Sequence, residues 1–371
     1  MKIIFVGGVD VPGQGGIENY VFNLAKALTE KGHECLVLCR GEQPAHQNID
    51  GININKLFVR ENQFAILVHN IKAAWKVWGE YKDFDVINFQ SIFLPFLYEW
   101  VPKIRGVKVV HTIHSFAHDN PKYNHFSRLI INIIYRLSSF VSSPLTTVSE
   151  QNRILIRKRL KKNSTVIHCG VNPPIHEEAT YHLDKFAVQK GKYYLTIGRI
   201  DPVKNLDVLI KAFMKHPLKD DVKLVIAGNA SNKYGECLRK LSNEDERVIF
   251  VGPVYGSEKS SLLNHCMAYC LVSSSEGFPI ALLEAMSYGC PCICSDIPAN
   301  KEALTERLGL WSKVQDEDSL FLCMKQLENS IETYMDLGEQ AKRFILSNLT
   351  WNIIADKYVD FFKSLKRNHS I

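Results

Sequence analysis

Short apolar runs alternate along most of the chain with amphipathic stretches of about 10 to 15 residues, a pattern typical of parallel strands joined by helices. The clearest unit has a predicted strand at residues 2–6, a glycine-rich loop at 13–16, a helix at 17–31 and a strand at 34–39. Further strands are predicted at residues 86–89, 107–111 and 145–148. The first part of the chain is therefore a predicted doubly wound α/β domain.

The same alternation starts again after a polar stretch at residues 172–192, which is the predicted linker. The strands of this second half are predicted at residues 193–197, 222–227, 248–251, 269–273 and 290–294. A chain of 371 residues exceeds what one hydrophobic core usually supports. We therefore expect two Rossmann-like domains, at residues 1–172 and 173–350, facing a central cleft that holds the ligand. Residues from about 351 to 371 form a predicted amphipathic helix that packs back on the first domain or caps the second.

Charge is unevenly placed along this globular chain. The net charge is +6, but residues 1–170 carry 21 Lys and Arg against 13 Asp and Glu. The first half is thus expected to face an anion, such as a lipid headgroup surface or a phosphorylated acceptor. Nucleic acid is disfavoured as a partner, because no zinc-finger spacing or basic-aromatic module accompanies the charge. The cationic segment at residues 153–162 fits either an anionic membrane surface or a solvated helix face.

Targeting and cysteine signals favour a protein of the cytoplasm. The opening apolar run is too short for a signal peptide, and the best apolar stretch, residues 129–141, is broken by Arg136. Ten cysteines without a secretion signal indicate free thiols. Cys290, Cys292 and Cys294 alternate along a predicted strand, and their spacing favours core thiols over a metal site.

The stretch at residues 273–285 is the most informative for function, because it leaves a strand and enters a helix. Pro279 suits the first helical position, and the amides of such a helix start make a ready diphosphate site. Glu276 lies in the loop and Glu284 lies two turns into the helix, so their carboxylates can flank the phosphates and accept hydroxyl hydrogen bonds. The alternative is a capping acid and a solvated helix face.

A second loop offers two cations. Gly198 and Arg199 follow the predicted strand at residues 193–197, and Lys204 comes five positions after Arg199. Arg199 can donate two hydrogen bonds to phosphate oxygens, and Lys204 can add a positive charge. Cations placed there stabilise the charge that grows on a departing nucleoside diphosphate.

The loop with Gly15 and Gly16 joins the first strand region to a helix and permits close backbone approach to a ligand. Its spacing is not G-x-G-x-x-G, and Arg40 stands where a ribose-binding acid is expected, so a nicotinamide dehydrogenase is disfavoured. Asp83 and Asp85 form a D-x-D, but they precede a predicted strand and are read as a turn instead of a metal site.

Together these residues resemble the retaining glycosyltransferases of family 4, which have the GT-B fold, over nearly the whole chain. Order and spacing both agree. The matching segments are residues 15–18, 147–150, 167–172, 198–204, 225–228 and 276–285. Three residues depart from the family's pattern: Pro279 replaces a common glycine, Cys169 a usual asparagine and Asn205 a frequent glycine.

The resemblance implies a role for each matching residue. Glu276 would contact the transferred sugar, Glu284 the nucleotide ribose, and Arg199 and Lys204 the diphosphate. The implied donor-binding residues also include Gly15, Gly16, Gly198, Gly228, Gly277, Phe278 and Ile280. His114 matches the family's histidine near the reacting sugar, where it would position and polarise a hydroxyl, whereas His111 is read as structural. The resemblance also implies that the enzyme needs no metal or other cofactor.

The hypothesis from sequence is a retaining transferase that moves a hexose or deoxyhexose from a nucleoside-diphosphate sugar to a hydroxyl of a glycan or lipid-linked acceptor. Bacterial surface polysaccharide assembly at the inner face of the cell membrane is its expected setting. Two alternatives stay open: a nucleotide-sugar epimerase of similar architecture, and a non-catalytic nucleotide-sugar-binding protein.

Overall fold

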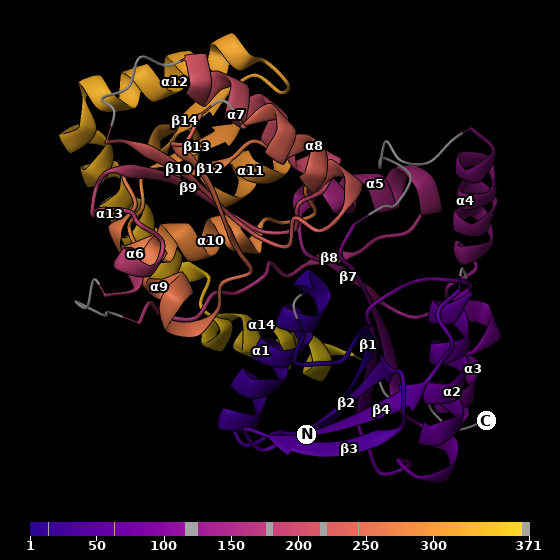
Figure 1. Cartoon of the computed structure of the whole chain (residues 1–371). Coiled ribbons are helices and arrows are strands. Elements are labelled where there is room, and N and C mark those ends of the chain that lie inside the picture. The colour runs from indigo at the N-terminus through magenta and orange to yellow at the C-terminus, as the bar shows by residue number, and fades with distance from the viewer. Residues whose placement is uncertain are drawn as a thin grey trace. The chain divides into compact units, whose positions relative to one another are not determined.

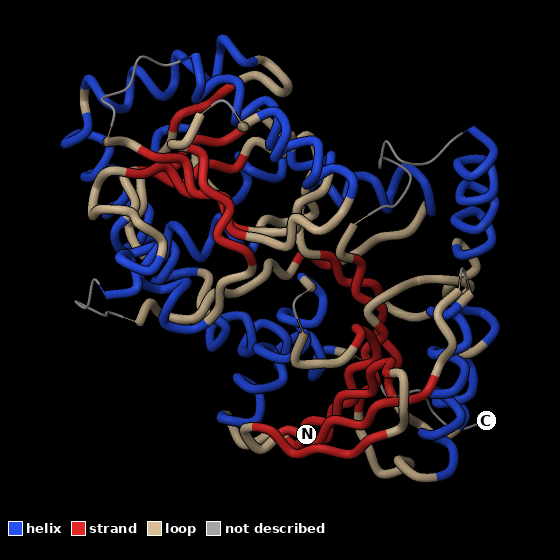
Figure 2. The backbone as a smooth tube through the Cα atoms, in the orientation of Figure 1, coloured by secondary structure: helices blue, strands red, loops and turns tan. Residues whose placement is uncertain are grey.

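The computed structural model describes residues 1–13, 15–62, 64–115, 125–175, 181–215, 221–243 and 245–365. The chain divides into two compact units (Figure 1). The first comprises Met1–Gly170 and Trp351–Ile371, and the second comprises Val171–Thr350. The domain limits proposed from sequence were 172 and 350. Each unit has a predominantly parallel sheet with helices beside it, as expected of a Rossmann-like domain (Figure 2).

The first unit is built on an eight-stranded sheet in the order β3-β4-β2-β1-β5-β6-β7-β8. All paired neighbours are parallel except β3 and β4, which form an antiparallel hairpin. Strands β1, β5 and β6 contain runs of successive buried residues because both faces of the sheet are covered there. The strands are β1 (Lys2–Val9), β2 (Glu34–Gly41), β3 (Ala45–Ile49), β4 (Ile52–Phe58), β5 (Val86–Phe89), β6 (Lys108–Ile113), β7 (Leu145–Thr147) and β8 (Thr165–Val166).

The first helix of this unit buries one apolar stripe. In the first helix, Tyr20, Leu24 and Leu28 recur at four-residue spacing and are fully buried. The helical elements are α1 (Gly16–Glu30), α2 (Ala65–Gly79), η1 (Pro95–Leu97), α3 (Trp100–Ile104), α4 (His125–Ser138), α5 (Glu150–Leu160) and α14 (Trp351–Ser364).

The last helix belongs to the first unit, although the whole second unit precedes it in sequence. α14 packs on α1, and the Tyr20 and Tyr358 hydroxyls are 2.5 Å apart in the buried contact. Trp351 lies so close to Gly170 that a Cβ there would stand 2.7 Å from the indole ring. Because glycine has no Cβ, the backbone at position 170 can pack directly against the Trp351 ring.

The second unit is built on a six-stranded sheet in the order β11-β10-β9-β12-β13-β14, and every pair is parallel. Its strands are β9 (Tyr193–Ile197), β10 (Lys223–Ala227), β11 (Val248–Gly252), β12 (Ala268–Leu271), β13 (Cys292–Ser295) and β14 (Leu310–Ser312). Its helical elements are α6 (Tyr181–Lys185), η3 (Pro202–Lys204), α7 (Leu206–Lys215), α8 (Lys233–Leu241), α9 (Gly256–His265), α10 (Ile280–Ser287), α11 (Pro298–Ala303), η4 (Glu306–Leu308), α12 (Glu317–Asn329) and α13 (Ile331–Asn348).

Three expectations from sequence need correction. The stretch taken as an irregular linker contains the short helix α6. Strand β13 begins at Cys292 and not at position 290, although Cys290, Cys292 and Cys294 are all buried as core thiols. Helix α10 begins at Ile280, so Pro279 precedes the helix as its capping residue.

Candidate active site

A recess in the second unit lies where the chain reverses its strand order. β9 pairs with β10 on one side and β12 on the other, so the carboxyl ends of these strands border a switch point. The lining residues are Thr196, Ile197, Gly198, Arg199, Lys204, Leu206, Ile226, Ala227, Leu271, Val272 and Ser273. Gly198, Arg199 and Lys204, three residues proposed from sequence, therefore line one recess.

Two glycine-bearing loops meet at this recess. The Gly198 amide donates to the Ala227 carbonyl at 3.0 Å, which ties the end of β9 to the end of β10. A Cβ added to Gly228 would stand 2.1 Å from the Gly198 carbonyl oxygen. Only glycine at position 228 permits this backbone approach.

The loop after β9 is held by its own side chains. Asp201 caps the turn η3 by accepting a hydrogen bond from the Val203 amide at 3.2 Å. Asn205 has a left-handed backbone with φ of 49°, and its Nδ2 donates to the Val272 carbonyl at 2.9 Å. Asparagine tolerates this conformation better than most residues, so its replacement of a frequent glycine leaves the loop's path available.

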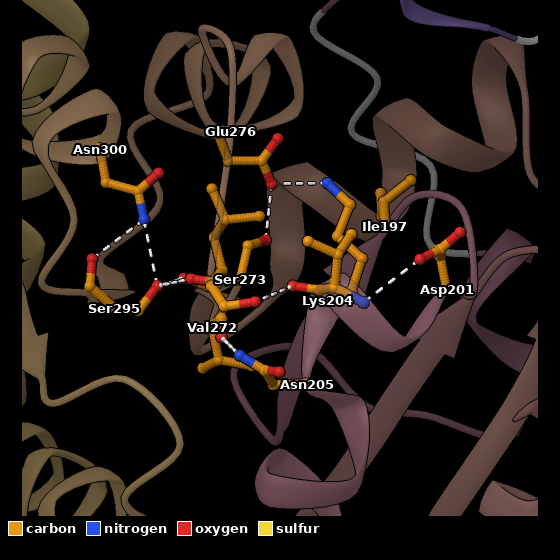
Figure 3. Close-up of polar contacts among 12 residues, drawn as sticks. Ile197, Asp201, Lys204, Asn205, Val272, Ser273, Glu276, Ser295 and Asn300 are labelled. Atoms are coloured by element: carbon orange, nitrogen blue, oxygen red, sulfur yellow. Dashed lines mark hydrogen bonds and ion pairs between the residues drawn. The ribbon is translucent and has the colours of Figure 1, made fainter. Parts of the chain in front are cut away.

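Lys204 and Glu276 form the centre of the site (Figure 3). Lys204 Nζ lies 2.6 Å from Glu276 Oε1, and the Ser273 hydroxyl donates to the same oxygen at 2.6 Å. The side chains of Lys204 and Glu276 are 19% and 13% exposed, which strengthens the ion pair relative to one in open water. The second Glu276 oxygen has no contact of this kind with the described residues, so it can accept a hydroxyl.

The backbone of Ser273 is held by a side chain at the end of β13. Its carbonyl accepts a hydrogen bond from the Ser295 hydroxyl, and Asn300 Nδ2 donates to the Ser295 carbonyl at 3.0 Å (Figure 3). These buried polar groups join the ends of β12 and β13 to the start of α11. They hold the loop that carries Glu276 in place.

Glu284 projects from α10 and is paired with Lys259 of α9, Oε1 to Nζ at 2.8 Å. Burial raises the pKa of Tyr269 well above its usual range, and the charges of Glu284 and Glu276 raise it further. The Tyr269 hydroxyl donates to the Ile197 carbonyl at 3.2 Å, at the end of β9. Both carboxylates thus lie near one phenol beside the recess. The start of α10 with Gly277, Phe278 and Ile280 follows Glu276 directly.

In the first unit, the side chain of Glu18 fills the loop that contains Gly15 and Gly16. Glu18 Oε1 accepts a hydrogen bond from the Val9 amide at 2.8 Å. A Cβ added to Gly15 would stand 1.9 Å from Glu18 Oε2, whereas one on Gly16 would meet open space. Gly15 therefore makes room for the carboxylate, and Gly16 at the start of α1 is the exposed glycine.

His114 follows β6 in the first unit and is half-buried. Its Nε2 lies 2.8 Å from Gln90 Oε1, and the Tyr20 ring meets its ring edge-on with centroids 4.7 Å apart. Burial lowers the pKa of His114 to about 4, so the imidazole is neutral near pH 7. A neutral imidazole carries no charge, donates a hydrogen bond from one ring nitrogen and accepts one at the other.

His111, read as structural, is fully buried and contacts groups of its own unit. Its Nδ1 is 2.8 Å from the Ser91 carbonyl oxygen and its Nε2 is 3.4 Å from Glu99 Oε2. Burial alone would raise the pKa of Glu99, but the neighbouring His111 and the hydrogen bonds from Ser143 and Ser142 lower it below its usual range. This cluster joins β6 to α3 and the segment before β7.

Other candidates from sequence have structural roles. The Asp85 carboxylate accepts a hydrogen bond from the Lys2 amide at 2.9 Å, as a strand entry would. In the part of the chain that the structure describes, no group of three or more His, Cys, Asp or Glu is arranged to hold a metal ion. On the basic helix α5, Ile156 and Leu160 are buried while Arg157 and Lys158 are exposed. Among the described helices, each is too short or too polar to span a bilayer.

Sequence reasoning missed Gln90, Lys259 and Tyr269. Each acts through a neighbour that is distant in sequence: Gln90 through His114, Lys259 through Glu284, and Tyr269 through the end of β9. Gln90 does leave a weak signal, because it follows a predicted strand directly and so sits where ligand-facing residues gather.

Comparison with known proteins agrees with this architecture. The family "Glycosyltransferase Family 4" matches residues 14–174, and the family "Glycosyl transferases group 1" matches residues 180–344. The chain is 24% identical to the phosphatidyl-myo-inositol mannosyltransferase of Mycobacterium leprae, over 97% of this chain and 96% of that protein.

Solved structures share the fold at low sequence identity. Sucrose-phosphate synthase from Thermosynechococcus elongatus superposes with a TM-score of 0.80 at 20% identity, covering 98% of each chain. HepE from Anabaena, solved in complex with UDP-glucose, gives a TM-score of 0.79 at 17% identity, covering 98% of this chain and 100% of that one. Two Rossmann-like units, the two family matches and these relatives lead to one conclusion: the chain belongs to the family 4 glycosyltransferases, enzymes of the GT-B fold.

Proposed function

We propose that this glycosyltransferase transfers a hexose or deoxyhexose from a nucleoside-diphosphate sugar to a hydroxyl of a glycan or lipid-linked acceptor, with retention at the anomeric carbon. The observation that carries the proposal is the Lys204–Glu276 pair beside a recess at the ends of β9, β10 and β12. Cations and a hydroxyl-accepting carboxylate stand together there, which is the chemistry that a sugar diphosphate requires.

In this proposal the second unit binds the donor. Arg199 and Lys204 hold the diphosphate, and the amides at the start of α10 add positive potential. Glu276 binds hydroxyls of the transferred sugar and Glu284 those of the ribose. Lys204 is shared between Glu276 and the phosphate, so donor binding exchanges part of an existing ion pair for a new one. The pair keeps both side chains oriented before the donor arrives.

Retention is proposed from the likeness to the retaining enzymes of family 4. No described side chain near the recess is assigned as a nucleophile, so the proposed route is displacement on one face of the sugar. The departing β-phosphate oxygen then accepts the acceptor's proton as the new bond forms on the same face of the sugar. Arg199 and Lys204 stabilise the leaving diphosphate most when its charge is greatest, so they lower the barrier more than they tighten donor binding. His114 of the first unit contacts a sugar hydroxyl, and no metal or other cofactor takes part.

The proposed setting is bacterial surface polysaccharide synthesis: lipopolysaccharide, capsule or exopolysaccharide. Two observations support a lipid-linked or surface-held acceptor. The first half of the chain is basic, and the mycobacterial relative is named for a lipid acceptor, phosphatidyl-myo-inositol.

The donor site is tested by Glu276→Gln, assayed with wild type against a panel of nucleoside-diphosphate sugars. Loss of the carboxylate charge leaves Lys204 unpaired and weakens sugar binding, so kcat/KM is expected to fall by about 100-fold or more. Glu246→Gln, at an exposed position of the same unit, is the matched control. Equal turnover by Glu276→Gln and wild type would remove the proposed site.

The same reaction separates the alternatives. Proton NMR of the product gives the anomeric configuration, and an inverted product would refute retention. A nucleotide-sugar epimerase would convert the donor without any acceptor, and a binding protein would release nothing. Strict dependence on an added glycan or lipid acceptor identifies the transferase.

We also propose that the first unit associates with an anionic membrane surface. The support is a patch on α2 and α3, where the exposed rings of Trp75 and Trp100 lie 6.1 Å apart and the Arg105 guanidinium is 4.0 Å from the Trp78 ring. Indole rings beside cations suit the headgroup level of a bilayer. The basic helix α5 suits it less, because Ile156 and Leu160 serve the core.

Liposome flotation distinguishes these two surfaces. Wild type is expected to float with anionic vesicles and to be released as salt rises, because the attraction is screened. Trp75→Ala with Trp100→Ala is expected to abolish flotation, whereas Arg157→Ala with Lys158→Ala should reduce it little. If only the Arg157→Ala, Lys158→Ala protein fails to float, the membrane-binding surface is on α5 instead. If wild type does not float, the membrane proposal is refuted.

A further inference from the structure

The residues packed around Gln90 hold its side chain in contact with His114. Gln90 directly follows β5, is only 5% exposed, and packs against Gly7 of the neighbouring strand β1. A Cβ on Gly7 would stand 2.6 Å from Gln90 Cβ, and Gly7 has φ of 154°. β1 pairs with β2 on one side and β5 on the other, so Gln90 lies at the switch point of the first sheet.

The Gln90 amide has one favourable orientation. Its Nε2 lies 3.4 Å from the Asn88 carbonyl oxygen, a group that only accepts hydrogen bonds. Reversing the amide would turn two carbonyl oxygens toward each other, so the nitrogen faces Asn88. Gln90 Oε1 then faces His114 Nε2 at 2.8 Å. An acceptor at that distance requires a proton on Nε2 of the histidine.

The rest of the His114 environment keeps the ring in place. The Tyr20 ring packs against it at an interplanar angle of 81°, and Asn152 Nδ2 donates to the His114 carbonyl at 2.9 Å. Burial is the cause of its lowered pKa, with no charged side chain contributing. The neutral ring holds one proton, on Nε2, which leaves Nδ1 with a lone pair. None of the described residues forms a hydrogen bond with Nδ1.

We propose that Gln90 is a positioning residue that fixes His114 as the Nε2–H tautomer, so that Nδ1 accepts a hydrogen bond from a sugar hydroxyl. The identity of the ligand rests on the proposed function, whereas the tautomer does not. His114 in this state cannot donate a proton to the leaving group. It selects for a hydroxyl on the substrate and against a deoxy position there.

The tautomer can be read directly by long-range proton–nitrogen NMR of protein labelled at the histidine nitrogens. The signals are assigned with His114→Asn. Wild type at pH 7 is expected to show a protonated Nε2 and an unprotonated Nδ1 at His114. A protonated Nδ1, or a charged ring at pH 7, would overturn the proposal without any activity measurement.

Substitution of Gln90 tests its effect on this ring and on catalysis. Gln90→Leu removes the acceptor, so a mixture of tautomers is expected, and kcat/KM should fall by about tenfold for the loss of one oriented hydrogen bond. Gln90→Glu restores an acceptor, so the Nε2–H tautomer should return and His114 should titrate above pH 4, because a carboxylate favours the imidazolium. Gln47→Leu, at an exposed glutamine of the same unit, is the matched control.

Mono-deoxy donors give a readout that a merely structural role would not produce. Wild type is expected to discriminate against one deoxy position, and Gln90→Leu should lose most of that discrimination. Equal discrimination in both proteins would refute the positioning role. Failure of this inference is separable from failure of the proposed function, because the Glu276→Gln assay tests the donor site alone.

Discussion

At the scale of single residues, close backbone approaches and ion pairs define the candidate site. Gly228 admits the Gly198 carbonyl, and Asn205 adopts the left-handed turn that leads from Lys204 into α7. Lys204, Glu276 and Ser273 are joined by two hydrogen bonds of 2.6 Å. The residues that carry chemistry are therefore held by their neighbours before any donor is bound.

Gly228→Ala is expected to disturb the fold of the recess. Its methyl group would meet a backbone oxygen that cannot rotate away, so the loops of β9 and β10 must separate, at a cost of about 1–3 kcal/mol of unfolding free energy. Thermal unfolding and donor binding by calorimetry measure both effects. Gly79→Ala, where a Cβ meets nothing within 4 Å, is the control. A Gly228→Ala protein with wild-type stability and affinity would show that the approach is not needed.

At the scale of secondary structure, helix starts are tied to the site loops. Asn232 caps α8 by accepting a hydrogen bond from the Gly235 amide at 2.8 Å. Its Nδ2 also donates to the Ile200 carbonyl at 2.7 Å, in the loop that carries Arg199. One side chain thus begins a helix and restrains the proposed diphosphate loop.

Asn232→Asp separates these two roles. The carboxylate still caps α8, but it cannot donate to Ile200 and places a negative oxygen beside that carbonyl, so the Arg199 loop should loosen while the cap is kept. Hydrogen exchange at the loop amides is expected to quicken and the donor KM to rise several-fold. Asp316→Asn, which changes the cap of α12 away from the recess, serves as the control. An unchanged exchange rate in Asn232→Asp would contradict the coupling.

Sequence patterns predicted the mainly apolar strands well and the polar hairpin of β3 and β4 poorly. β5 and β9 were placed at their observed limits because both are short, mainly apolar runs in which almost every residue is buried. β3 and β4 were missed because Asn48, Asn53 and Asn55 give their hairpin a polar face. Arg199, Lys204 and Glu276 were proposed from their loops, whereas Gln90 was not, because its partner His114 is 24 residues away.

At the scale of the whole molecule, the two histidines whose pKa values burial lowers to about 3 and about 4 both lie in the first unit. The pKa of His69 is lowered to about 3, mainly by burial, with the charge of Arg40 adding to the effect. The pKa of His114 is lowered to about 4 by burial. Both histidines lie in the first unit. Below pH 6.5, the ordinary histidine pKa, these two side chains are protonated in the unfolded chain but stay neutral in the folded unit. Lowering the pH therefore destabilises that unit.

Stability of the first unit is expected to fall between pH 6.5 and 4.5 with a slope of about 1.4 kcal/mol per pH unit for each histidine. His69→Gln should remove one such contribution and flatten the slope. Urea unfolding at several pH values, with pulse proteolysis to follow peptides of each unit, measures it. His46→Gln, at an exposed histidine, is the control. An unchanged slope in His69→Gln would refute the assignment.

The return of α14 to the first unit has a consequence for how the chain is made. Tyr20 and Gly170 emerge from the ribosome long before Tyr358 and Trp351, their partners in the core. Because α14 covers apolar surface of the first unit, that unit cannot complete its core until α14 has been synthesised, after the whole of Val171–Thr350.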